Sequence, residues 1–297
     1  MRVGIDVGGT TVKIGFIDDY KIIKAYEINT KKETLFDEVL ASIKKVSEEN
    51  NYKIDFVGFG LPGVVKDNII VKLPNIGIHD YNLQEKFNEY FDVPMASSND
   101  ANVAALGEVI CDPNAYSSCY MITLGTGVGG GFVLNNEVIN GNHSSCGEIG
   151  HTFIDYVHNY KCSCGLSGCL ETVASATGIV RLAREYYNKY ETSLNYDTMD
   201  CKSVMDAAKN NDPLGLYVYN LVCDYLGRAI ANIACTTDVE AFYIGGGVSK
   251  AGEFLLNGIK KSYSKFAFYG LKDTIITLAK LGNNAGMLGA AYLVKNI

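Results

Sequence analysis

Apolar runs interrupted by glycine-rich polar turns mark the beginning of the chain. The run RVGIDV reaches Asp6, Gly8 and Gly9 form a turn, and a second apolar run extends from Val12 to Ile17. This order predicts a hairpin of two strands whose tip carries hydroxyl side chains. The segment CYMITLGTGVGGGFVLNNEVI, from residue 119 onward, repeats the order of strand, glycine turn with a threonine, and returning strand. Two copies of one hairpin design are compatible with an internal duplication.

Apolar residues at helical spacing predict an amphipathic helix over residues 33–50. Short strands are predicted within IDFVGFGLPGVV and NIIVKL, and a strand, three glycines and a helix within EAFYIGGGVSKAG. Further helices are expected at 81–91, from Asn99 or Asp100 onward, at about 171–190, at about 213–235 and at 285–296. This mixture of strands and helices indicates an α/β fold.

The length of 297 residues allows two domains, each with its own core. The turn Asp112-Pro113-Asn114 separates the two hairpins and serves as the boundary. We therefore predict a smaller α/β domain of residues 1–114, joined by the closing helix at about 284–297. A larger α/β domain is predicted over residues 115–283.

The charge balance and the apolar pattern narrow the class of protein. A net charge of -7 argues against a nucleic-acid partner, which would favour clustered Lys and Arg. No stretch of about 18 apolar residues predicts a membrane span, and the N-terminus does not resemble a signal peptide. We expect a cytoplasmic protein, in which nine cysteines are mostly buried thiols or metal ligands.

Glycine turns that follow buried strands let backbone N–H groups approach a phosphate closely. Three such turns occur, at 8–11, 125–131 and 245–247. A G-x-G-x-x-G pattern occurs at 125–130 and at 58–63, but strand-like runs follow both, whereas a dinucleotide site needs a helix there. A single glycine turn is more often a plain hairpin turn. Two tips of the same design favour phosphate binding, and their polar residues are Thr10, Thr11, Lys13 and Thr126.

Two aspartates adjoin these features. Asp6, at the end of a strand beside the first tip, is suited to hold Mg²⁺ through water, and a turn-forming role is the alternative. Asp100 begins a predicted helix, whose macrodipole favours the ionised carboxylate that a proton acceptor needs. Taken alone, Asp100 is more often an ordinary helix cap.

Ordered motifs along the chain resemble the ROK family of bacterial sugar kinases and repressors, most closely its glucokinase-like members. The motifs are IDVGGTTVKIG, GFGLPG, LPN at 73–75, SNDANVAALGE, LGTGVGGG, GEIGH at 147–151, CSCGLSGCLE and YIGGG. The resemblance covers essentially the whole chain. It implies a duplicated actin-like, ribonuclease-H-like ATPase fold with two domains and a cleft between them, and a homodimer.

The resemblance also implies roles for individual residues. ATP phosphates, with Mg²⁺, are expected between the two tips, and the binding residues implied are Asp6, Gly8, Gly9, Thr10, Thr11, Lys13, Gly125, Thr126, Gly127, Gly129, Gly245, Gly246 and Gly247. Asp100 is the expected base for a sugar hydroxyl, and the sugar contacts implied are Gly63, Asn75, Asn99, Asp100, Glu148, His151 and Glu171. The expected reaction transfers the γ-phosphoryl group to the 6-hydroxyl of an aldohexose, glucose first. Phosphoryl transfer depends mainly on positioning and charge neutralisation, which this set supplies.

Departures from the family pattern leave the sugar open. Ser144 stands where glucokinase relatives usually have Gly, Cys146 where they have Ala, and IGIHDY lacks the usual Trp. N-acetylmannosamine, N-acetylglucosamine, fructose and allose are the alternative substrates. A non-catalytic sugar-binding or regulatory ROK protein is a further alternative, although a repressor would need a helix-turn-helix region before the first hairpin. An actin-like scaffold would not need GEIGH beside a cysteine cluster.

The segment KCSCGLSGCLE places three cysteines within eight residues, which suggests a disulfide, a redox pair, a catalytic thiol or a metal site. Cys162 and Cys164 are too close for a relaxed disulfide, C-x-C is not a dithiol redox motif, and phosphoryl transfer needs no thiol. With His151, eleven residues upstream, the cysteines make a Cys3His set that closes a tetrahedral zinc shell. We predict a structural Zn²⁺ bound by His151, Cys162, Cys164 and Cys169.

Overall fold

The first hairpin forms as predicted in the computed structural model, which describes residues 1–294. β1 (Arg2–Val7) and β2 (Thr11–Asp18) pair antiparallel, with Asp6 opposite Lys13. They belong to a five-stranded sheet of order β3-β2-β1-β4-β8, with β3 (Lys21–Asn29), β4 (Phe56–Leu61) and β8 (Met95–Asn99). β4 and β8 run parallel to β1, and strand β3 was not predicted.

Helices cover both faces of this sheet. The apolar sides of α1 (Leu35–Asn50) and α2 (Leu83–Asn88) join its hydrophobic core. α9 (Ala285–Ala291) lies on the sheet so closely that a Cβ at Gly4 would come within 1.8 Å of the Met287 carbonyl oxygen. α3 (Asp100–Ile110) packs on α9. A three-stranded sheet completes the region, with β5 (Val64–Lys66), β6 (Ile69–Leu73) and β7 (Ile78–Asn82).

Two helices are shorter than predicted. The helix expected at 81–91 begins at Leu83, because Asn82 ends β7 and its side chain accepts a hydrogen bond from the Glu85 N–H as the N-cap. The closing helix expected at 285–296 ends at Ala291, and the last three residues of the expected 284–297 segment lie outside the described residues.

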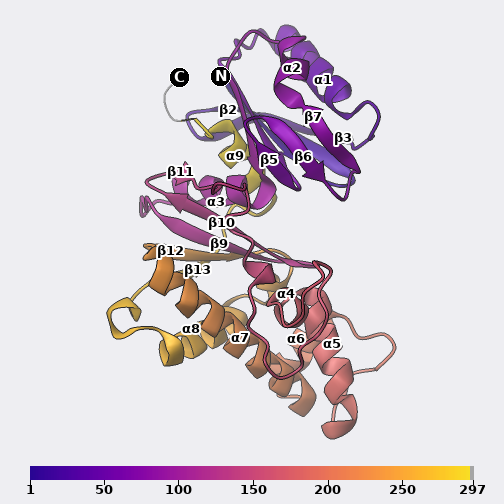
Figure 1. Ribbon diagram of the computed structural model, residues 1–297, viewed down its shortest axis with the longest axis vertical. Helices are drawn as coiled ribbons and strands as arrows, with labels where there is room; N and C mark the ends of the chain where they lie inside the picture. The colour runs from indigo at the N-terminus through magenta and orange to yellow at the C-terminus, as the bar shows by residue number, and fades with distance from the viewer. Residues whose placement is uncertain (295–297) are drawn as a thin grey trace. The chain divides into compact units, whose positions relative to one another are not determined.

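The second hairpin consists of β9 (Cys119–Leu124) and β10 (Val128–Leu134). The sheet that contains it has the order β11-β10-β9-β12-β13, with β11 (Glu137–Val138), β12 (Ala241–Gly245) and β13 (Ile275–Leu278). Its helices are α4 (Glu171–Ala174), α5 (Ala176–Tyr186), α6 (Cys201–Lys209), α7 (Pro213–Thr237) and α8 (Glu253–Phe266). α7 and α8 pack side by side in Figure 1. β13 and α6 were not predicted.

The chain divides into two compact units. The first comprises Met1–Cys119, Gly131–Gly147 and the chain from Lys280 onward, and the second comprises Tyr120–Gly130 and Glu148–Ala279. The division predicted from the sequence, 1–114 with about 284–297 and then 115–283, differs from this mainly at 131–147. Those residues join the first unit because the second half of β10 packs on α3, where a Cβ at Gly131 would lie 2.4 Å from the Ala101 carbonyl oxygen.

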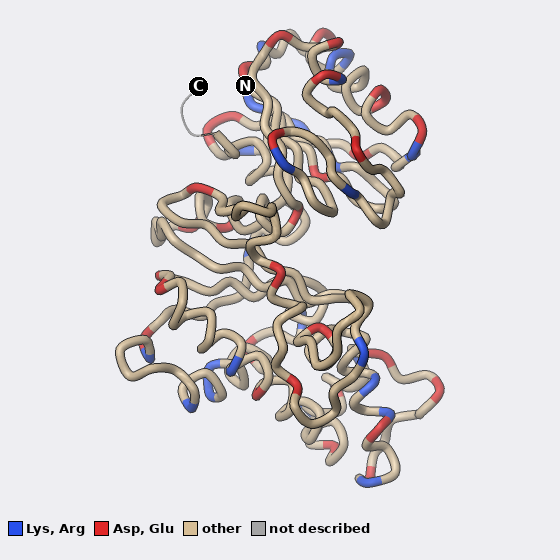
Figure 2. The backbone as a smooth tube through the Cα atoms, in the orientation of Figure 1, with Lys and Arg blue, Asp and Glu red and all other residues tan. Residues whose placement is uncertain are grey.

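Charged side chains of both signs are interspersed along the backbone of each unit, as Figure 2 shows. No basic stripe of the kind that tracks a nucleic-acid backbone stands out in that view. Within residues 1–294, none of the helices combines the length and the apolar character needed to cross a membrane.

Candidate active site

Three of the predicted sugar-side residues meet at the start of α3, in the first unit. Asn99 caps the helix, because its side-chain oxygen accepts from the Ala101 N–H at 2.9 Å. Its Nδ2 donates to the Gly63 carbonyl oxygen at 3.2 Å. Asp100 is the first helical residue, and its Oδ1 also accepts from the Ala101 N–H, at 2.8 Å. The structure thus brings Gly63, Asn99 and Asp100 together, whereas Asn75 lies in the exposed turn after β6.

The first glycine tip carries a carboxylate at its base. The Gly8 N–H donates to the Thr11 carbonyl oxygen at 2.9 Å, which closes the turn and leaves Gly9 and Thr10 exposed. The Asp6 carboxyl packs against Gly286 at the start of α9, where a Cβ would lie 2.7 Å from Asp6 Cγ. Burial raises the pKa of Asp6, and the charge of Lys13 opposes that shift. A divalent cation near Asp6 would likewise favour its ionised form.

The second glycine tip, in the second unit, is tied to α5. The Ala176 N–H donates to the Gly125 carbonyl oxygen at 2.8 Å, and Thr177 Oγ1 donates to the Thr126 carbonyl oxygen at 2.9 Å. Glu171 Oε2 accepts from the Val128 N–H at 3.1 Å. A Cβ at Gly127 would lie 2.2 Å from that same oxygen, so the position requires glycine.

A cavity of about 980 Å³ opens beside this tip. Gly125, Thr126 and Gly247 line it, whereas Gly245 and Gly246 do not, because Gly245 is buried in β12. Its apolar lining includes Val180, Met199, Met205 and Val248, and its basic lining consists of Arg181, Arg184, Lys202, Lys209 and Lys250. Apolar walls, backbone N–H groups and cationic side chains together suit a phosphorylated ligand with an apolar or aromatic part. The sequence reasoning missed these basic residues, since their helices meet only in the folded chain.

The four predicted metal ligands converge in the second unit. One candidate ligand atom from each of His151, Cys162, Cys164 and Cys169 lies within 4.8 Å of all the others. Cys164 Sγ and Cys169 Sγ are 3.7 Å apart, and Cys162 Sγ is 3.5 Å from His151 Nδ1. Zinc–sulfur bonds of about 2.3 Å at tetrahedral angles place two sulfurs about 3.8 Å apart. The spacing and the chemistry of this donor set therefore fit Zn²⁺.

The predicted sugar carboxylates flank this cluster. Cys162 Sγ donates to Glu171 Oε1 at 3.8 Å, and Glu148 Oε2 lies 4.0 Å from His151 Nε2. His151 therefore turns Nδ1 toward the sulfurs and leaves Nε2 on the side of Glu148. Burial and the neighbouring thiols raise the pKa of Cys169 to about 12. A bound cation would relieve that cost of gathering thiolates.

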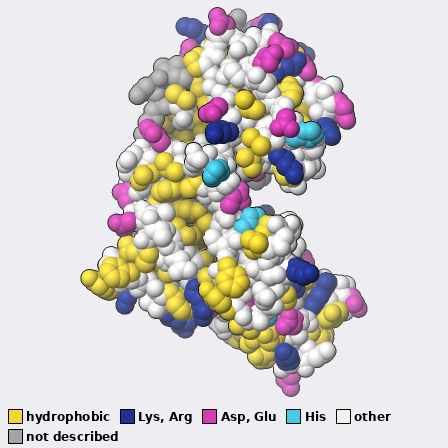
Figure 3. Space-filling view, in the orientation of Figure 1, with side chains coloured by type: hydrophobic (Ala, Val, Ile, Leu, Met, Phe, Trp, Pro, Cys, Tyr) yellow, Lys and Arg dark blue, Asp and Glu magenta, His cyan; other side chains and the backbone are white. Residues whose placement is uncertain are grey.

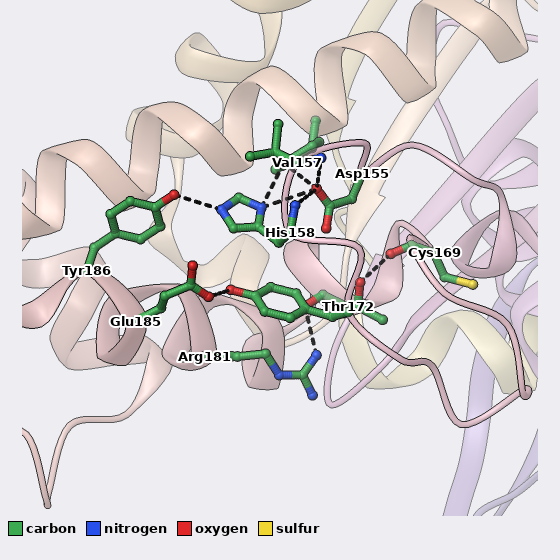
Figure 4. Close-up of polar contacts among 10 residues, drawn as sticks. Asp155, Val157, His158, Cys169, Thr172, Arg181, Glu185 and Tyr186 are labelled. Atoms are coloured by element: carbon green, nitrogen blue, oxygen red, sulfur yellow. Dashed lines mark hydrogen bonds and ion pairs between the residues drawn. The ribbon is translucent and has the colours of Figure 1, made fainter.

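A buried histidine anchors the loop that carries the cysteines (Figure 4). The His158 side chain is only 3% exposed, and its Nδ1 lies 3.1 Å from Asp155 Oδ1 and from the Tyr225 hydroxyl. Its Nε2 lies 3.0 Å from the Tyr186 hydroxyl on α5. Burial alone would raise the pKa of Asp155, but hydrogen bonds from His158, Tyr225 and Val157 hold it below its usual value. The loop is thus fixed to α5 and α7 by an ionised carboxylate.

Tyr160 and Arg181 extend the anchor toward the cavity. The Tyr160 ring stacks on His158 with centroids 5.2 Å apart, and the Arg181 guanidinium lies 5.0 Å from the centre of that ring. The Tyr160 hydroxyl bonds Glu185. Because His158 alone would read as an ordinary core histidine, sequence reasoning did not single it out.

We predict that His158→Ala lowers the free energy of unfolding by about 3 kcal/mol, because it leaves the Asp155 carboxylate buried with fewer partners. Urea denaturation followed by circular dichroism measures the loss. Tyr186→Phe removes a single hydroxyl and should cost about 1 kcal/mol. Equal midpoints for His158→Ala and the wild type would show that the buried network does not stabilise the fold.

The fold and the two tips define the class first: this is an actin-like ATPase fold. The chain matches the ROK family over residues 2–297 and belongs to it. It is 40% identical to the glucokinase of Halalkalibacterium halodurans, over 99% of this chain and 94% of that protein. It is 28% identical to an N-acetylmannosamine kinase of Haemophilus influenzae, over 99% of this chain and 95% of that protein. The structure of a ROK glucokinase from Streptomyces griseus with glucose and AMPPNP superposes with a TM-score of 0.76, at 30% identity and 99% coverage of both chains.

Proposed function

We propose that this protein is an ATP-dependent kinase that phosphorylates the 6-hydroxyl of an aldohexose, with glucose as the preferred sugar. The observation that carries the proposal is Asp100, held as the first residue of α3 beside the Asn99 cap. A carboxylate at a helix N-terminus stays ionised and can accept the proton of a sugar hydroxyl. The likeness to glucokinases over the full chain supports the same reaction.

The donor is ATP, and its adenosine occupies the cavity beside the second tip. The chemistry of the cavity supports this, because its apolar walls suit a base and Gly125, Thr126 and Gly247 suit phosphates. The first tip, with Gly8 to Thr11 and Lys13, contributes further phosphate contacts, and Gly129 supports the second tip. Asp6 holds Mg²⁺ through water. When bound, Mg²⁺ neutralises charge on the phosphates, and the protein supplies position.

The sugar is held by polar side chains that replace its hydration. Gly63, Asn75, Asn99, Glu148, His151 and Glu171 are the proposed contacts, since a hydroxyl-rich substrate binds only where buried groups match its hydrogen bonds. His151 serves twice in this proposal, with Nδ1 on Zn²⁺ and Nε2 on the sugar. The metal is held by His151, Cys162, Cys164 and Cys169 and has a structural role.

N-acetylmannosamine is the second candidate substrate. A relative that bears that name, at 28% identity, supports it. In the glucokinase alternative, the loop before Glu148 keeps its sharp turn although Ser144 replaces glycine, because Ser144 itself adopts a left-handed φ of 51°.

An ADP-release assay over a panel of sugars tests the proposed reaction. We expect glucose to give the highest kcat/KM, with N-acetylmannosamine, N-acetylglucosamine, fructose and allose below it. Phosphate analysis of the product should locate the ester at the 6-position. ADP release that does not depend on sugar would refute the kinase assignment, and a preference for N-acetylmannosamine would select the second candidate.

We also propose a cytoplasmic homodimer. Apolar side chains exposed on the cysteine loop support a protein partner, and they are Phe153, Tyr156, Val157 and Leu166. Figure 3 shows apolar side chains at the surface of the second unit. Sedimentation equilibrium of the purified protein distinguishes a dimer from a monomer.

A further inference from the structure

The loop from Asn140 to Gly147 leads directly into Glu148 and has a demanding backbone. Gly141, Ser144 and Gly147 adopt positive φ angles of 74°, 51° and 102°. Serine adopts this region less readily than glycine, so the loop needs support from its surroundings. Part of that support is local, because the Cys146 N–H donates to the Asn140 carbonyl oxygen at 3.0 Å.

The side chain of Asn140 connects the loop to buried polar groups. Its Oδ1 accepts from Ser98 Oγ at 2.6 Å and from Asn102 Nδ2 at 3.2 Å. Ser98 and Asn102 are each only 2% exposed, so neither donor has water as a ready alternative. One amide oxygen therefore satisfies two buried donors at once.

Asn102 connects this anchor to the start of α3. It lies in the first helical turn, two residues after Asp100, and its backbone N–H reaches the Asn99 side-chain oxygen at 3.4 Å. Its Oδ1 accepts from the Phe132 N–H on β10 at 3.3 Å. The helix that presents Asp100 and the loop that leads into Glu148 thus share one buried amide.

We propose that Asn102 and Asn140 are positioning residues for sugar recognition, which fix the loop at 140–147 relative to the N-terminus of α3. This inference rests on the proposed sugar-kinase function. Neither residue is assigned to touch the sugar. They act through the loop, and therefore through the placement of Glu148, so their loss changes sugar affinity and selectivity while nucleotide affinity stays.

Two substitutions of one residue separate this role from general stability. Asn140→Leu has a similar size and no acceptor, whereas Asn140→Asp keeps the oxygen that Ser98 and Asn102 bind. We expect Asn140→Leu to raise KM for glucose about tenfold, which is the size of one lost buried hydrogen-bonded group. Asn140→Asp, assayed at pH 8, should stay within about threefold of the wild type. KM for ATP should stay within about twofold in both variants, because the nucleotide cavity lies in the second unit.

A matched control and a double variant complete the kinetic test. Asn50→Ala removes an amide of the same unit that accepts from Lys24 and donates to the Val46 carbonyl oxygen, and it should leave both KM values unchanged. Asn102→Ala with Asn140→Leu should cost no more than either single change, since both break one network. Equal glucose KM values in Asn140→Leu and the wild type would overturn the proposal. A fall in kcat shared by Asn140→Leu and Asn50→Ala would also overturn it.

Hydrogen exchange provides a readout that needs no sugar. In Asn140→Leu we expect the Cys146 amide to exchange about tenfold faster than in the wild type, because the loop opens more often. Unchanged exchange overturns the anchor. A wild-type protein that phosphorylates no sugar would refute the proposed function while this exchange result still tests the loop.

Discussion

Asp100→Asn is expected to lower kcat for glucose phosphorylation by about 10³-fold, with little change in glucose affinity. Asparagine has the same shape and can still accept the hydrogen bond that the Ala101 N–H gives to Asp100. It cannot accept a proton, and a positioned general base contributes about 10²- to 10⁴-fold. The loss therefore falls on kcat. A coupled ADP assay measures kcat, and isothermal titration calorimetry measures glucose binding without turnover.

The matched control for this variant is Asp212→Asn. Asp212 is also an aspartate at a helix start, where its side chain accepts from the Gly215 N–H at 2.9 Å as the N-cap of α7. Its change to asparagine preserves a capping oxygen, so kcat should remain within about threefold of the wild type. If Asp100→Asn retained a comparable kcat, Asp100 would be a cap alone and another group would have to accept the proton.

The hairpins and the long helices were predictable from local pattern. The two glycine turns between apolar runs predicted β1–β2 and β9–β10, and the start signal Asp212-Pro213 predicted α7 close to its true bounds. Strand β3 was missed because it alternates exposed and half-buried residues around charged side chains. α6 was missed because its first turn depends on a capping box between Asp200 and Ser203 within a polar stretch.

The site divides in the same way. The cysteine cluster was predictable because its members lie close in sequence and share one chemistry, and the structure brings the four ligands together. The buried His158 network and the Asn102–Asn140 contact join residues 67 and 38 positions apart, namely His158 with Tyr225 and Asn102 with Asn140. No local spacing signals such pairs. They depend on how helices and loops pack, which single-sequence patterns do not specify.

Cys162→Ser is expected to remove zinc and to raise KM for glucose about 10- to 100-fold. Cys162 Sγ lies beside both His151 Nδ1 and Glu171 Oε1, so its loss frees one sugar-binding side chain from the metal and one from its thiol partner. Groups that orient functional ligands typically contribute effects of about this size. Elemental analysis of freshly purified protein should find about one zinc per wild-type chain and well below that in the variant.

The nucleotide readout and a control cysteine make this prediction specific. Cys235 is exposed and lies outside the cluster, so Cys235→Ser should keep both zinc and the glucose KM. KM for ATP should change by less than about threefold in Cys162→Ser, because the tip at Gly125 and Thr126 keeps its own hydrogen bonds to α5. Zinc-free wild-type protein would refute the metal assignment. If instead both KM values rose together, the metal would support the whole second unit and not the sugar contacts, because the tip and the cysteine loop would then have been destabilised as one.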